Sequence, residues 1–162
     1  GRGATFTIRL PLADATSVAG EFSDTGQYRL TRSAQLLSGV NVLLVDDDSD
    51  TLALMATALT RRQANVTAVS SAGEAIRAIT QKRPDVLISD IAMPDEDGYG
   101  LIEKIRRLEN GESQIPAVAI TAYAKDEDRE RALSSGFQIY LAKPVELTEL
   151  ISVVARAARR EF

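Results

Sequence analysis

Cysteine and histidine are both missing from this chain of 162 residues. Without cysteine there is no disulfide framework, no thiol chemistry and no thiolate metal site. No apolar run approaches the roughly 18 residues that a membrane span needs, and the chain has no recognisable signal peptide. These absences argue against a disulfide-stabilised scaffold, a thiol enzyme and a membrane-spanning segment.

Positive charge is also scarce. The chain has 19 lysines and arginines against 23 acidic residues, which gives a net charge of −4 and a pI near 5.0. This balance offers no electrostatic case for nucleic-acid binding, and we interpret the Arg159–Arg160 pair as charge at the end of a helix. The composition, 44% apolar and 26% charged, is typical of a soluble globular protein. Because the chain begins at Gly1 rather than Met, we expect it to be a fragment of a longer protein. We expect a cytoplasmic setting for the fragment, although the parent protein could still be anchored to a membrane.

Strand and helix patterns alternate five times from Val40 onward. The strands are predicted at Val40–Val45, Asn65–Val69, Asp85–Ser89, Ala117–Ile120 and Gln138–Leu141. The helices are predicted from Ser49 or Asp50 through Leu59, from Ser71 to before Pro84, at Tyr99–Leu108, at Asp126–Ser135 and from Glu146 to about Arg159. This alternation predicts an α/β fold, a five-stranded doubly wound parallel sheet with helices on both faces.

Two of the predicted helices differ in how much of their surface is apolar. The helix at Tyr99–Leu108 has a predicted buried stripe made of Leu101, Ile102, Ile105 and Leu108. The helix at Asp126–Ser135 instead holds six charged residues before Ala132. We therefore predict that the second of these is a weakly packed surface helix, a candidate for movement or for contact with a partner.

Acidic, hydroxyl and ammonium side chains follow four of the predicted strands. The residues at these strand ends are Asp46, Asp47, Asp48, Asp90, Thr121 and Lys143. In an open parallel sheet, ligands bind at the carboxyl ends of the strands, so these side chains are expected to meet at one edge. Clustered carboxylate oxygens hold a hard divalent cation such as Mg²⁺, and a carboxylate beside such a metal can act as a nucleophile toward phosphorus.

The order of these motifs resembles the receiver domain of two-component response regulators. The motifs are Val45-Asp46-Asp47-Asp48, Ser89-Asp90, Met93-Pro94-Asp95-Glu96-Asp97-Gly98, Thr121-Ala122 and Lys143-Pro144. The resemblance runs from Val40 to Arg159. It implies the flavodoxin-like receiver fold, with the receiver domain over residues 39–162.

The resemblance also implies the chemistry of the site. Asp90 would be the phosphoacceptor, taking a phosphoryl group from a phosphohistidine. Mg²⁺ would be held by Asp47, by Asp46 mainly through water, by Asp90 and by the backbone carbonyl of Ala92. The phosphohistidine would belong to a kinase dimerisation domain or to a histidine phosphotransfer domain, with no nucleic-acid or membrane contact by this fragment.

Further roles follow from the same resemblance. Lys143 would pair with Asp90 and then with the phosphoryl oxygens, and Thr121 would donate its hydroxyl to the phosphoryl group. Tyr140 would be the aromatic switch residue, turning inward when Thr121 moves. Pro144 would follow a cis peptide bond, which only X-Pro bonds adopt at low cost.

The first residues resemble part of a different domain. Residues 1–12 include the alternating segment Thr5–Leu10 and look like the last strand of a histidine-kinase ATP-binding domain. Residues 13–38, rich in Ser, Thr, Asp and Gly, are interpreted as a linker. The implied parent is a hybrid sensor histidine kinase. The fragment has neither ATP-binding glycine motifs nor a histidine, so we expect it neither to bind ATP as a kinase nor to phosphorylate itself from a histidine.

Two other interpretations stay open. A haloacid-dehalogenase-like phosphohydrolase also uses an aspartate nucleophile and Mg²⁺, with a second acid two residues on, as Asp46 and Asp48 could provide. That interpretation leaves Asp90 unexplained. The other is a receiver-like interaction domain that is never phosphorylated. In the receiver interpretation Asp48 begins a helix, and Asp95 and Asp97 are loop or cap residues.

Overall fold

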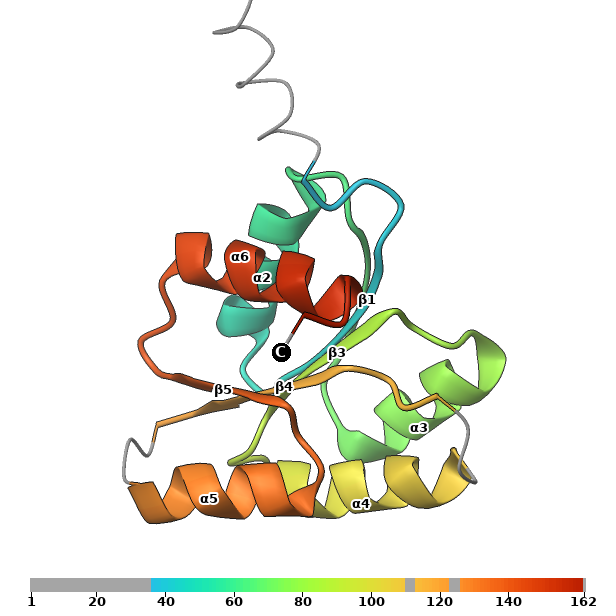
Figure 1. The fold of residues 1–162 in the computed structure, drawn as a ribbon, viewed down its shortest axis with the longest axis vertical. Coiled ribbons are helices and arrows are strands. Elements are labelled where there is room, and N and C mark those ends of the chain that lie inside the picture. Colours follow the sequence, from blue (N-terminus) through green and yellow to red (C-terminus); the bar gives the residue numbers. More distant parts are fainter. Residues whose placement is uncertain (1–35, 110–112, 123–125, 162) are drawn as a thin grey trace, which may run out of the picture.

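The computed structural model describes residues 36–109, 113–122 and 126–161 (Figure 1). The strands are β1 (Asn41–Val45), β2 (Asn65–Val69), β3 (Val86–Asp90), β4 (Ala117–Thr121) and β5 (Ile139–Ala142). The helices are α2 (Ser49–Thr60), α3 (Ala72–Gln81), α4 (Gly98–Leu108), α5 (Asp126–Ser135) and α6 (Leu147–Ala158). Among the described helices, none has the length and apolar character to cross a bilayer.

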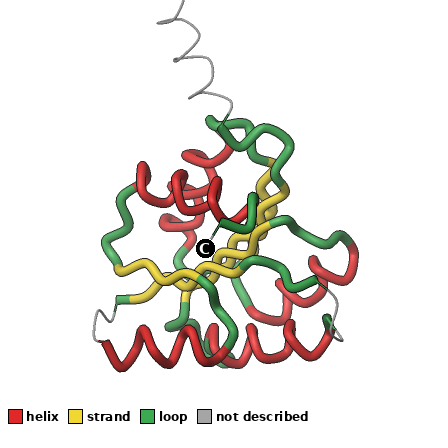
Figure 2. The backbone as a smooth tube through the Cα atoms, viewed as in Figure 1, coloured by secondary structure: helices red, strands yellow, loops and turns green. Residues whose placement is uncertain are grey.

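The five strands form one parallel sheet in the order β2-β1-β3-β4-β5. Helices α2 and α6 cover one face, and α3, α4 and α5 cover the other (Figures 1 and 2). Every residue of β3 and β4 is buried, because helices pack on both faces of these central strands. The predicted five-stranded doubly wound sheet and its flavodoxin-like receiver topology are confirmed.

Side-chain caps determine where three of the helices begin. Asp48 caps α2 by accepting hydrogen bonds from the backbone N–H groups of Asp50 and Thr51, at 2.8 and 3.0 Å. The prediction that Asp48 begins a helix is confirmed, and the helix starts at Ser49, one of the two predicted positions. Asp97 caps α4, and Ser71, where the sequence predicts that the next helix begins, caps α3. Each cap satisfies amide groups that have no partner within the helix.

A buried polar network at the end of α4 explains one wrong burial prediction. Arg106 donates two hydrogen bonds to the Glu109 carboxylate, at 2.8 and 3.0 Å, and others to the carbonyl oxygens of Ile115 and Gly136. The side chains of Arg106 and Glu109 are only 13% and 4% exposed. Because this pair takes the inward positions of the last turn, Leu108 faces outward and is 54% exposed.

Helix α5 is attached to the rest of the fold by few buried side chains. Within its described side chains only Ala132 is fully buried, and Leu133 is 40% exposed. The Arg131 guanidinium lies over the Tyr99 ring of α4, 4.1 Å from its centroid, a cation–π contact of modest strength at an exposed site. The predicted weak packing of this helix is confirmed.

The packed unit begins earlier than the predicted boundary at Gly39. Leu37 is fully buried in the core between the sheet and the pair α2 and α6, and its backbone N–H donates to the Arg62 carbonyl. The predicted linker, residues 13–38, therefore includes part of the domain, because a single leucine can complete the core without any periodic pattern around it. The predicted kinase remnant, residues 1–12, and most of that linker lie outside the described residues.

We predict that Leu37→Ala lowers the free energy of unfolding by about 2–4 kcal/mol, since it leaves a cavity in the core. Leu36→Ala is the matched control, because Leu36 is 37% exposed and its truncation is expected to cost about 0.5 kcal/mol. Urea unfolding of both variants measures the difference. Equal losses would show that Leu37 is not part of the core.

Candidate functional site

The carboxyl ends of four strands bring the predicted site residues together. Asp46 directly follows β1, Asp90 ends β3, Thr121 ends β4 and Lys143 directly follows β5. Asp46, Asp90 and Thr121 are at most 4% exposed. Such burial is unusual for carboxylates and has to be balanced by charge or hydrogen bonds.

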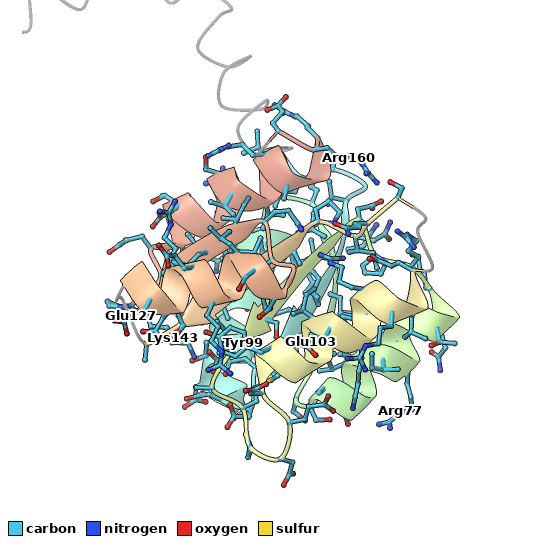
Figure 3. The ribbon with its side chains drawn as sticks, turned by 60° about the horizontal axis from the view of Figure 1, so that its bottom comes forward. Arg77, Tyr99, Glu103, Glu127, Lys143 and Arg160 are labelled. Atoms are coloured by element: carbon cyan, nitrogen blue, oxygen red, sulfur yellow. The ribbon has the colours of Figure 1, made fainter. Side chains whose placement is uncertain are left out.

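Lys143 supplies that balance. Its Nζ lies 3.1 Å from Asp46 Oδ2 and 3.1 Å from Asp90 Oδ2. Its backbone N–H donates to the Thr121 carbonyl at 2.7 Å, which attaches the lysine to β4. Burial lowers the pKa of Lys143, but the hydrogen bonds to Asp46 and Asp90 together outweigh burial, so its pKa is raised. The ammonium therefore stays charged between the two carboxylates. Figure 3 labels Lys143, on the side of the molecule away from Arg160.

The Asp46 carboxylate is under electrostatic strain. Burial raises its pKa and the nearby Asp90 adds to the rise, while hydrogen bonds from the Asp48 backbone and from Lys143 oppose it. The Asp48 N–H donates to Asp46 Oδ1 at 2.9 Å, which leaves Oδ2 for the lysine. An added positive charge at this edge would relieve the strain.

The donor set fits a hard divalent cation. Carboxylate oxygens of Asp46, Asp47 and Asp90 all lie within 4.8 Å of one another. Ligands about 2.1 Å from Mg²⁺ are at most about 4.2 Å apart, so a small inward shift of these oxygens would let them share one ion. Asp47 is exposed and leaves the site open to solvent, and Ala92 is exposed in the loop after β3.

The backbone around Asp90 is held by close packing that the sequence did not reveal. Gly98 donates its N–H to the Ile91 carbonyl at 2.9 Å. A Cβ atom added at Gly98 would lie 2.5 Å from the Asp90 carbonyl oxygen and 2.9 Å from Ile91 Cα. From the sequence, Gly98 was only the end of a loop. One signal in the sequence could have indicated this close packing: a glycine at the start of a helix, where residues with higher helix propensity are usual.

The remaining predicted residues lie on the β4–β5 side of the site. Tyr140 is half-buried in β5, where it pairs with Ala119 of β4, and Thr121 pairs with Ala142. Burial, followed by repulsion from Asp128, raises the pKa of the Tyr140 hydroxyl. The Lys143–Pro144 peptide bond is cis.

Asp48 has a different use from the one that a phosphohydrolase would need. One of its carboxylate oxygens accepts the two α2 backbone hydrogen bonds that begin the helix, and the residue is exposed. These hydrogen bonds lower its pKa. The haloacid-dehalogenase-like alternative, with Asp46 as nucleophile and Asp48 as second acid, therefore loses its second acid.

Comparison with known proteins agrees with this arrangement. The family model described as the response regulator receiver domain matches residues 42–155. An uncharacterised 14.6 kDa protein of Leptolyngbya boryana is 47% identical over 74% of this chain and 91% of its own length. The hybrid signal transduction histidine kinase D of Dictyostelium discoideum is 35% identical over 71% of this chain, which spans only 8% of that kinase.

Solved structures give the same result. The receiver domain of the Francisella response regulator 1452 superposes with a TM-score of 0.71 at 27% identity, over 76% of this chain and all of that one. The receiver domain of the Pseudomonas aeruginosa sensor histidine kinase PA1611 gives a TM-score of 0.68 at 34% identity, over 75% and 99% of the two chains. That structure has a magnesium ion coordinated in its active site cleft.

We predict that Gly98→Ala lowers the free energy of unfolding by about 1–3 kcal/mol, because the methyl group overlaps rigid backbone. Gly73→Ala is the matched control in α3. The nearest atom to its added methyl group is the flexible Arg77 guanidinium at 3.8 Å, so this variant should gain about 0.5–1 kcal/mol. Urea unfolding measures both. If Gly98→Ala is as stable as wild type, the close approach to Asp90 does not constrain the site.

Proposed function

The chain belongs to the response regulator receiver family, and from this premise we propose that it accepts a phosphoryl group on Asp90 in a two-component phosphorelay. One observation carries most of the proposal. The Lys143 ammonium is shared, at 3.1 Å each, between Asp46 and Asp90. This contact joins three strand ends into one site, in which a single ammonium offsets part of the negative charge of three carboxylates, Asp46, Asp47 and Asp90.

The proposed reaction is phosphoryl transfer from a phosphohistidine. An Asp90 carboxylate oxygen attacks phosphorus, the new O–P bond forms, and the P–N bond breaks with its electron pair returning to the imidazole. The Lys143 ammonium exchanges the Asp90 carboxylate for a phosphoryl oxygen as its partner. The Thr121 hydroxyl donates a hydrogen bond to a second phosphoryl oxygen. Mg²⁺ held by Asp46, Asp47, Asp90 and the Ala92 carbonyl would supply the remaining charge neutralisation, which is the main requirement of this chemistry.

Phosphorylation is proposed to change the surface beside the site. A shift of Thr121 toward the phosphoryl group would free space into which Tyr140 turns, and α5 flanks both residues. The weak packing of α5 supports this proposal, because an element with few buried side chains needs little energy to move. Such a two-state surface is a common way to transmit a local charge change.

The phosphoryl donor is proposed to dock on α2. This helix begins at Asp48, next to the site, and carries Leu54, an exposed leucine with 58% of its surface accessible. Leu54 would supply an apolar contact on a helix whose first residues adjoin the phosphoacceptor. The donor would be a kinase dimerisation domain or a histidine phosphotransfer domain. The setting would be cytoplasmic, where ATP supplies phosphohistidine, and the parent would be a hybrid sensor histidine kinase, like the Dictyostelium relative.

Labelling with a small phosphodonor tests the acceptor. Acetyl phosphate with Mg²⁺ should add one phosphoryl group to wild type, observed by intact mass, and none to Asp90→Asn. Asp47→Asn should also stay unlabelled, because it removes a metal ligand. Asp48→Asn is the control and should be labelled normally, since asparagine caps a helix as well as aspartate does. Labelling of Asp90→Asn at the wild-type level would exclude Asp90. Absence of labelling in wild type would favour the interaction-domain alternative.

Docking is tested separately with a protein donor. Leu54→Asp should leave acetyl phosphate labelling unchanged, but slow transfer from a phosphorylated histidine phosphotransfer protein by about tenfold, the effect of losing a moderate contact. Leu108→Asp, which alters a leucine exposed to a similar extent (54%) on α4, is the control and should transfer normally. Equal transfer rates for both variants would place the docking surface elsewhere.

A further inference from the structure

Four exposed arginines lie at the ends of α2 and α6, at the sheet edge opposite the candidate site, and are called the arginine cluster below. Helices α2 and α6 run back along the same face of the sheet, so both end at this edge (Figure 1). Arg61 directly follows α2, Arg156 lies in the last turn of α6, and Arg159 and Arg160 follow that helix. All four residues are exposed, and within the described part of the chain none of them makes an ion pair or a side-chain hydrogen bond.

Two local features shape the surface around these arginines. Arg160 adopts a left-handed backbone with φ of 59°, a conformation that glycine takes without steric cost and arginine does not. This conformation ends α6, because the Arg160 N–H donates to the Ala157 carbonyl at 2.9 Å and the Glu161 N–H donates to the Arg156 carbonyl at 3.0 Å. The exposed Leu36 adjoins the end of α2, where the next residue, Leu37, hydrogen-bonds to Arg62. This surface therefore combines guanidinium groups with one exposed leucine side chain.

The acids of the phosphoacceptor site do not cancel this positive charge. The two clusters lie at opposite ends of strands that are five residues long, which corresponds to roughly 16 Å. This separation exceeds the Debye length of about 8 Å at physiological ionic strength. Glu161, which is exposed beside Arg160, offsets only one of the four positive charges. A short acidic ligand at the arginine cluster is therefore attracted locally, although the whole chain carries a net charge of −4.

We propose that Arg61, Arg156, Arg159 and Arg160 form a docking surface for a short acidic protein segment. The fork-shaped guanidinium group pairs with carboxylates through two parallel hydrogen bonds, and Leu36 would contact an apolar residue of the partner. Nucleic acid and an anionic bilayer are disfavoured as partners. Both are extended polyanions, so the acidic residues on the rest of the molecule would repel them. This proposal is independent of Asp90 phosphorylation.

Fluorescence anisotropy with a labelled oligo-glutamate peptide tests the proposal. Combined Arg61→Gln, Arg159→Gln and Arg160→Gln should weaken binding about tenfold, as expected for losing several exposed ion pairs. Combined Arg77→Gln, Arg107→Gln and Arg129→Gln is the control, because it removes the same charge from exposed sites elsewhere, and should change affinity less than about twofold. Thermal melting confirms that both variants are folded.

Three outcomes would overturn the proposal. The first is that the peptide does not bind wild type at low salt. The second is that both triple variants lose the same affinity, which would indicate attraction by net charge alone. The third is that duplex DNA or phosphatidylserine vesicles bind wild type as tightly as the peptide does, with the same dependence on Arg61, Arg159 and Arg160, which would assign the surface to another class of partner.

Discussion

The shared ion pair of Lys143 with Asp46 and Asp90 is the interaction on which the candidate site depends. A parallel sheet brings these two acids to one edge whether or not their charges are compatible, and both are buried there. The ammonium, 3.1 Å from each, makes that burial tolerable. This arrangement of one ammonium and several carboxylates fits the proposed binding of a divalent metal and of a phosphoryl group.

Rigid backbone supports this charge arrangement from behind. Strand β3 is buried along its whole length, and Gly98 packs directly against the Asp90 carbonyl. The far end of α4 is held by Arg106, which bonds to the carbonyl oxygens of Ile115 and Gly136. Helix α4 is thus fastened at both ends. The backbone that carries Asp90, the proposed acceptor, therefore has little freedom to move, which suits a reaction that depends on positioning.

The neighbouring helix α5 has the opposite character. It contributes one fully buried alanine among its described side chains, and its Arg131 lies over the Tyr99 ring of α4. A rigid strand end beside a weakly packed helix suits the proposed signalling role. If Asp90 is phosphorylated as proposed, β3 would not move to accommodate the added charge, and the least costly response would be a shift of α5.

The sequence by itself determined the elements and the chemistry of the site edge. Apolar runs buried on both faces identify the central strands, and in a parallel sheet the residues after those runs must meet, so Asp46, Asp90, Thr121 and Lys143 were predictable. The weak packing of the Asp126–Ser135 helix was also predictable, because its six charged residues cannot all be buried.

Only the tertiary structure decided the features that depend on long-range packing. These are the burial of Leu37, the exposure of Leu108, the Arg106–Glu109 network and the close approach of Gly98 to Asp90. Each depends on which of several side chains occupies a given site in the folded core. Periodicity places Leu108 inward, but a buried ion pair with backbone carbonyls to satisfy takes that position instead. The local sequence pattern shows whether a residue favours a buried or an exposed position. When two residues compete for one buried position, only the three-dimensional contacts decide which of them is buried.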